Sequence, residues 1–173
     1  TNLPNTLALN GIMTIIPTFQ DGVLSLGVDS KSQQSFENII NDVTFKHKLI
    51  DQKMYVGGFS VGGSCAIKYS ENAKMKPTAV FAIDPPLDFE RFYKAAKRDI
   101  RLSKNREPNP ENIYMIDRLE KETGGSPTTN LAEYYQLSPY SFSDTTQTAI
   151  KKIGHLPLRI YTEPDIQWWL KER

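Results

Sequence analysis

The sequence is poor in histidine and cysteine, which limits the metal chemistry open to it. Of its 173 residues two are histidine and one is cysteine, without the spacings that metal sites use. Because a structural zinc site needs about four such ligands, we expect no metal site, and no motif calls for a cofactor. The lone cysteine, Cys65, cannot form an internal disulfide, so cysteine usage assigns no redox compartment.

An excess of charge and a long apolar run are also missing. Lys and Arg total 21 and Asp and Glu total 20, which leaves a net charge of +1. This balance gives no electrostatic reason to expect nucleic acid as a partner. No apolar stretch approaches the roughly 18 residues that a membrane span requires. Oligomeric state and cellular location do not follow from the composition.

Strand and helix patterns alternate along the chain. Apolar or β-prone runs predict strands at residues 11–17, 53–56, 78–83 and 156–161. Apolar residues at helical spacing predict a helix over 32–49, and a second helix should follow the second strand. Such alternation indicates an α/β fold, a parallel sheet with helices on both faces. Residues 1–173 should form one domain.

A long segment separates the last two predicted strands and has helical patterns of its own. Within this insert, residues 87–154, an apolar stripe predicts a helix from Phe89 to Ile100. The next helix is delimited by Asn109 as its N-cap, Pro110 in its first turn and Gly124 at its end. Two shorter helices are expected over 131–137 and 145–153.

The most informative motif is a serine among glycines, GGFSVGG at residues 57–63. It joins a predicted strand to a predicted helix, the context in which G-x-S-x-G describes a nucleophile on a sharp turn. Because Ser60 must take unusual backbone angles there, we expect Gly58 and Gly62 to avoid clashes. The Val61 amide is then free to donate to an oxyanion. A structural turn is one alternative; a phosphate loop is another, but its lysine and glycine spacings are missing.

The order of strand, serine turn, small-residue helix, strand, helical insert and strand resembles the α/β-hydrolase superfamily, over about residues 11–165. The final strand ends in Thr-Glu-Pro-Asp, which resembles the family position of the triad acid. The resemblance therefore implies Asp165 as the acid, with Glu163 as a near alternative. Asp84 is a third candidate, because some relatives place the acid one strand earlier. A cap or turn role is the alternative for each.

A triad histidine should follow the acid in the family order, and none follows Asp165. His47 and His155 each precede a predicted strand, whereas catalytic groups gather at the carboxyl ends of parallel strands. About six strand residues separate each from that edge by ~20 Å, too far for a general base. The family's early strand with a second oxyanion amide is also not recognisable before Gly11. The sequence resembles a partial hydrolase domain, either cropped from a longer protein or a non-catalytic homologue.

The resemblance implies a serine hydrolase, foremost a carboxylic-ester hydrolase acting on a small-molecule ester or acyl substrate. Ser60 would attack the carbonyl, a histidine outside this chain would take its proton, and Asp165 would orient that histidine. A serine peptidase or amidase of the same fold and a non-catalytic binding module are the alternatives. The insert lies where relatives carry a lid. Its aromatic residues either line an acyl pocket or pack the insert onto the sheet: Phe89, Phe92, Tyr93, Tyr114, Tyr134, Tyr135 and Tyr140.

Overall fold

The computed structural model describes residues 2–19, 26–49, 52–103, 107–163 and 170–171. Three parallel strands form its sheet, in the order β1 (Tyr55–Phe59), β2 (Ala79–Ile83), β3 (Leu158–Tyr161). The register pairs Phe59 with Ile83 and Ile83 with Tyr161, so the three strands end level with one another. The prediction of an α/β fold with a parallel sheet is therefore confirmed.

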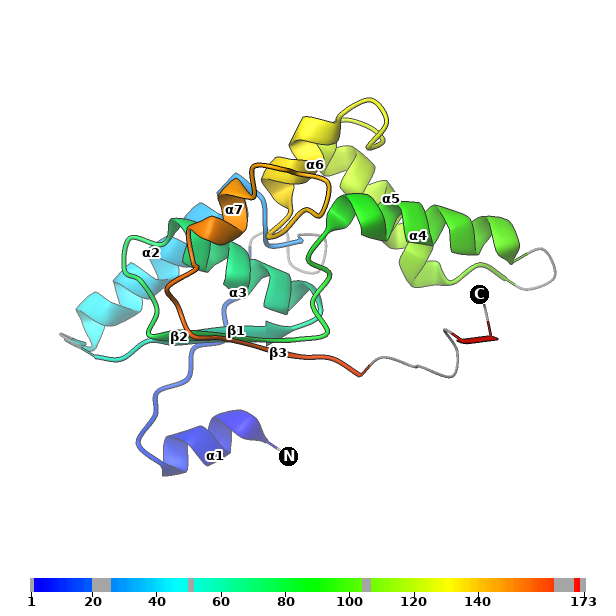
Figure 1. Cartoon of the computed structure of the whole chain (residues 1–173). Coiled ribbons are helices and arrows are strands. Elements are labelled where there is room, and N and C mark those ends of the chain that lie inside the picture. The colour runs from blue at the N-terminus through cyan, green and yellow to red at the C-terminus, as the bar shows by residue number, and fades with distance from the viewer. Residues whose placement is uncertain (1, 20–25, 50–51, 104–106, 164–169, 172–173) are drawn as a thin grey trace.

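Two helices pack on one face of this sheet (Figure 1). α3 (Val61–Asn72) follows β1 directly, and α2 (Ser30–Lys46) precedes it in the chain. The Asp29 carboxylate caps α2 by accepting the N–H of Ser32 at 2.9 Å. The sheet core joins side chains of both helices, the strands and the end of the insert: Ile40, Val56, Ala66, Ile67, Tyr69, Ala73, Val80, Ala82 and Ile153.

The described part of the insert between β2 and β3 contains four helices: α4 (Phe89–Leu102), α5 (Pro110–Thr123), α6 (Leu131–Leu137) and α7 (Thr148–Lys151). The predicted bounds of α5 are confirmed. Asn109 Oδ1 accepts the N–H of Glu111 at 2.9 Å, and Gly124 ends the helix in the left-handed region, at φ 77°. α7 is shorter than predicted. The insert core also includes two residues that precede α2, and its members are Leu26, Val28, Phe89, Tyr93, Ala96, Met115, Ile116, Leu119, Tyr134 and Leu137.

The insert is anchored to α3 through a buried lysine. Lys68 Nζ donates to the carbonyl oxygen of Ser138 at 3.2 Å, just after α6. Ser138 in turn accepts the N–H of Phe89 on its hydroxyl at 3.0 Å, at the start of α4. The helix that begins at the candidate nucleophile and the first helix of the insert are thus connected through one residue.

The strand predicted at 11–17 is not formed. Residues 12–19 have no regular structure, and the apolar side chains there are largely exposed, from 41% at Ile15 to 74% at Ile16. A strand needs a neighbour for its N–H and C=O groups, and no described residue pairs with this segment. An apolar run alone therefore misidentified it. β1 is consequently an edge strand of the described sheet.

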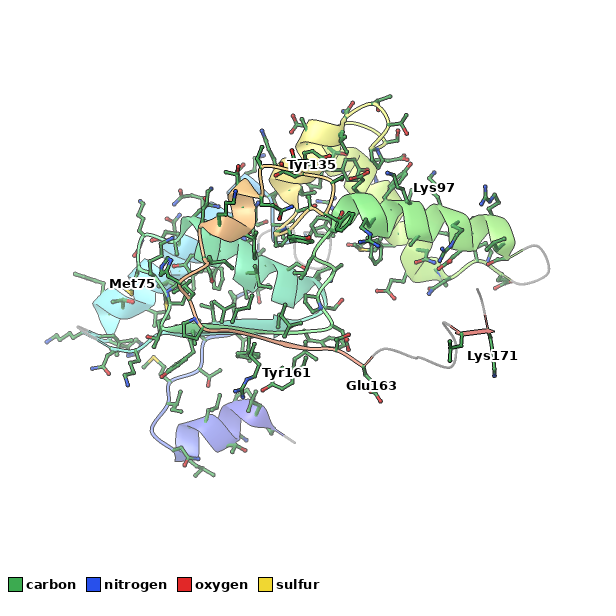
Figure 2. The ribbon with its side chains drawn as sticks, in the orientation of Figure 1. Met75, Lys97, Tyr135, Tyr161, Glu163 and Lys171 are labelled. Atoms are coloured by element: carbon green, nitrogen blue, oxygen red, sulfur yellow. The ribbon has the colours of Figure 1, made fainter. Side chains whose placement is uncertain are left out.

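The two faces of the sheet are covered unequally (Figure 1). α2 to α7 lie on one side, and α1 (Leu3–Leu9) lies on the other. Tyr55 and Phe59 alternate with the buried Val56 and are 57% and 67% exposed on that second side. Tyr161, 48% exposed, also points there (Figure 2). Helices on both faces were predicted, but among the described elements the short α1 is the one helix on the second face.

Candidate functional site

Ser60 lies on the turn between β1 and α3 with backbone angles that non-glycine residues seldom take, φ 51° and ψ −128°. Its N–H donates to the carbonyl oxygen of Ile83 at 2.8 Å, which extends the strand pairing past β1. Its carbonyl oxygen accepts the N–H of Gly63 at 2.9 Å, which begins α3. Strand pairing and helix start together hold a conformation that costs of order 1–3 kcal/mol. The backbone follows the strained strand–turn–helix course that the motif describes.

The glycines around Ser60 are not equivalent. A Cβ atom on Gly58 would lie 2.4 Å from the carbonyl carbon of Gly62, so any side chain at 58 displaces the turn. A Cβ on Gly62 meets no described atom within 4 Å, so the prediction that Gly62 avoids a clash is wrong. The Cβ atom that a side chain would add at position 62 points into open space and not into the turn. Gly63, which lies outside the G-x-S-x-G core of the motif, packs close to β2: a Cβ atom on Gly63 would lie 3.0 Å from the Ala82 Cβ.

Two polar groups at this turn are without partners among the described residues. The Ser60 hydroxyl makes no capping hydrogen bond to α3, and no described group bonds to it. The Val61 N–H occupies the first position of α3, where no earlier carbonyl of the helix is available to accept it. A helix N-terminus favours negative charge. The turn therefore presents a hydroxyl and, one residue later, a backbone N–H, neither of which has a partner among the described residues.

A cleft of about 460 Å³ opens at Ser60, between the carboxyl ends of the strands and the insert. α4 contributes Phe92, and α5 contributes Glu111 and Met115. The remaining lining residues come from the turn and from the strand ends: Ser60, Val61, Asp84, Pro85, Pro86, Leu87, Ile160 and Thr162. Of these residues, the motif predicted Ser60 and Val61, the family resemblance offered Asp84, and Phe92 was among the aromatic residues that could line a pocket; the others were not predicted.

The insert's aromatic residues mainly pack the insert itself. Phe92 is the only one among the described lining residues of the cleft. Phe89 and Tyr134 are fully buried and Tyr93 is 7% exposed, all within the insert core. Tyr93 and Tyr134 meet edge to face, with ring centroids 5.9 Å apart. These three residues pack within the insert and do not line the cleft, and packing of the insert onto the sheet is not confirmed for them either.

A larger hollow, about 650 Å³, lies between α2, α3 and the ends of α5 and α6. Its described lining is mainly polar and includes Glu37, Lys68 and Glu133. None of the described candidate site residues lines it. Size alone therefore does not identify the site, and the cleft at Ser60 is the one that combines a hydroxyl with a free helix N-terminus.

The three candidate acids differ in placement. Asp84 directly follows β2, lines the cleft with Ser60 and has a positive φ of 45°. Its Oδ1 accepts the N–H of Glu163 at 3.3 Å, which connects the end of β2 to the chain beyond β3. The Glu163 side chain is exposed and points away from the insert (Figure 2). Asp165 lies outside the described residues.

Both histidines lie on the amino-terminal side of the strands. His47 is the C-cap residue of α2, and two residues separate His155 from the start of β3; both histidines are exposed. The strands are parallel, so their amino-terminal ends lie at one edge of the sheet. His47 comes before β1 and His155 before β3, whereas Ser60 follows β1 at the opposite edge. Neither histidine lines the cleft. Their placement agrees with the expectation that neither is the general base of Ser60.

No family model matches this chain, and no curated protein or solved structure shows detectable similarity to it. The resemblance to α/β hydrolases therefore depends on the turn, the strand order and the position of the insert. Within the described ranges, no helix combines the length and apolarity needed to cross a membrane. The same residues contain no group of three or more His, Cys, Asp or Glu side chains arranged for a metal ion.

Proposed function

We propose that this chain contains the nucleophile of a serine hydrolase of the α/β-hydrolase type, acting on carboxylic esters. The observation that carries the proposal is the conformation of Ser60, with φ at 51° at the floor of a cleft. If this turn had a structural role alone, glycine at position 60 would form it equally well. Serine has a steric cost there and makes no structural hydrogen bond with its hydroxyl to any described residue.

The chemistry assigns each group one role. Ser60 Oγ attacks the ester carbonyl carbon, and its proton passes to a general base supplied from outside residues 1–173. The carbonyl oxygen becomes an oxyanion that accepts the Val61 N–H. Collapse of this intermediate expels the alcohol, which takes the proton from the base, and leaves an acyl-serine. Water then releases the acid by the same steps.

Asp165 is proposed as the acid that orients the base, on the resemblance alone. Asp84 has a different role in this account. Its hydrogen bond to the Glu163 N–H holds the chain that leads toward Asp165 next to the end of β2. Asp84 is therefore a positioning residue, and Asp165 is the carboxylate that contacts the base.

The cleft favours an ester over a peptide as substrate. Its described walls are mostly apolar, through Leu87, Phe92, Met115 and Ile160. A peptide presents an N–H and a C=O at every residue, and each costs free energy when buried without a partner. An acyl chain has no such groups. A peptidase or amidase is therefore the second candidate.

The test is hydrolysis of p-nitrophenyl butyrate by the full-length gene product. Ser60→Ala should lower kcat/KM by at least about 10³-fold, because the nucleophile is lost. Ser30→Ala, at the exposed start of α2, is the matched control and should leave turnover unchanged. Turnover that survives Ser60→Ala would refute the proposal, and a wild-type protein that binds esters without hydrolysing them would favour the binding module.

A further inference from the structure

Apolar side chains from three elements face the space in front of Ser60. Phe92 comes from α4, Met115 from α5 and Ile160 from β3. Met115 is 3% exposed and belongs to the insert core, and Phe92 packs against that core, so these two side chains are held in place. Burial of one CH₂ group on such a wall strengthens binding by about fourfold. The wall therefore suits an apolar group of the substrate.

The charged side chains of the cleft are all of one sign. Asp84 and Glu111 line it, from the end of β2 and the first turn of α5, and none of the described lining residues is Lys or Arg. An anion in this space would meet two carboxylates with no described counter-ion beside it. Repulsion between two unit charges about 4 Å apart lowers the binding affinity by about fivefold even in water, and by more in a partly closed cleft.

Two basic residues of α4, Lys94 and Lys97, do not offset this charge. Lys94 pairs with Glu90, and Lys97 lies 3.6 Å from Glu120 and over the Tyr93 ring. Lys97 is on the side of α4 that faces away from the sheet (Figure 2). These positive charges are thus engaged elsewhere, and none of these side chains lines the cleft.

We infer that the Ser60 cleft selects esters that have an apolar acyl group and no negative charge. The inference names the substrate class of the proposed hydrolase and rests on that proposed function. Glu111 is its main charge determinant, because Asp84 already accepts a hydrogen bond from the Glu163 N–H. Phe92 is its main apolar determinant, because it is the insert's aromatic side chain in the cleft.

The experiment measures binding to the full-length Ser60→Ala protein, so that no ester is turned over. Three hexanoyl esters of similar size are compared by calorimetry at low salt: 3,3-dimethylbutyl hexanoate, hexanoylcholine and 2-sulfoethyl hexanoate. The anionic sulfoethyl ester should bind at least tenfold more weakly than the neutral one. Adding Glu111→Gln should improve binding of the anionic ester about threefold to fivefold and leave the neutral ester unchanged. Higher salt should narrow the difference.

Two control variants make the test specific. Asp117→Asn removes a carboxylate from the same helix, 2.7 Å from Lys121 and outside the cleft lining, and should change none of the three affinities. Phe92→Ala should weaken the binding of hexanoyl esters severalfold more than the binding of acetyl esters. Phe142→Ala, at an exposed ring under Arg91 outside the cleft, should affect neither.

Equal affinity for the anionic and neutral esters, or an equal effect of Asp117→Asn and Glu111→Gln, would overturn the inference. So would an unchanged acyl-length preference in Phe92→Ala. These results are distinguishable from failure of the proposed function, because binding is measured without the nucleophile. A wild-type protein that does not hydrolyse esters contradicts the hydrolase alone.

Discussion

Ser60 and Asp84 are neighbours at the carboxyl edge of the sheet, and both have positive φ angles, 51° and 45°. Phe59 and Ile83, the residues before them, are partners in the parallel register of β1 and β2. The Ser60 N–H donates to Ile83, and the Asp84 N–H donates to Tyr161 across the next pair of strands. Two adjacent strands therefore end in strained residues that face one cleft, each held by a hydrogen bond to the following strand.

This arrangement separates the two candidate acids by experiment. Asparagine at 84 keeps an oxygen that accepts the Glu163 N–H, whereas alanine removes it. If Asp84 only positions the chain, Asp84→Asn should retain kcat within about tenfold and Asp84→Ala should lose more. Asp165→Asn should lower kcat by about 10⁴-fold, because the base loses its orienting partner. Steady-state kinetics of the full-length protein distinguish the two roles. If Asp84→Asn abolished kcat and Asp165→Asn kept it, Asp84 would be the acid and Asp165 would not.

The two motif glycines provide a matched pair for stability. Gly58→Ala places a Cβ 2.4 Å from a backbone carbon, so it should cost more than about 2 kcal/mol of unfolding free energy or prevent folding. Gly62→Ala meets open space within a helix and should be neutral or stabilising by up to ~1 kcal/mol. Urea unfolding of both variants measures the difference. Equal destabilisation would contradict the description of the turn.

Local chemistry predicted the ends of helices better than the apolar pattern did. Asn109, Pro110 and Gly124 fixed both ends of α5, because capping involves only neighbouring residues. Apolar spacing extended α2 to residue 49, but the helix ends at Lys46. The run at 11–17 has the composition of a buried strand and lacks the pairing partner that makes one.

The cleft was the least predictable part of the molecule. Phe92 lies in the same apolar stripe as Phe89, Tyr93 and Ala96, which are core residues. Its place in the cleft depends on how α4 packs against α5 and α6, which no local pattern encodes. The serine turn was predictable, because strand, glycine, serine and helix are consecutive in the chain.

Burial of Glu71 predicts a pH dependence of stability. Burial raises the pKa of Glu71 to about 7, against the opposing effects of Lys68, 3.1 Å away, and of Lys152 and Lys76. The folded state therefore holds this proton more tightly than the unfolded state does. Its contribution is complete below about pH 4.5 and is lost as the pH rises through 7.

The matched comparison is urea unfolding of wild type and Glu71→Gln from pH 4 to pH 8. The wild type should lose up to roughly 3 kcal/mol relative to the variant as the pH rises across that window. Glu133→Gln changes an exposed residue of α6, and the unfolding free energy of this variant should have the same pH dependence as that of the wild type. A constant difference between wild type and Glu71→Gln would show that folding does not raise the pKa of Glu71.

Residues 1–173 expressed alone should show essentially no triad-level esterase activity. His47 and His155 lie before the strands, so neither supplies a base to Ser60. A second oxyanion donor in well-studied hydrolases contributes about 3 kcal/mol, and no such donor is identified among the described residues. Hydrolysis of p-nitrophenyl butyrate measures this. Robust turnover that is lost in His47→Ala or His155→Ala would reverse the assignment of the catalytic edge.

The central claim is that Ser60 is an activated nucleophile, and covalent labelling tests it most directly. The full-length gene product is treated with a fluorophosphonate, in which the serine oxygen displaces fluoride from phosphorus, and the modified peptide is identified by mass spectrometry. The account predicts one adduct, on Ser60, formed faster than on any other serine and absent from Ser60→Ala. Labelling on another serine, or unchanged labelling of Ser60→Ala, would contradict it.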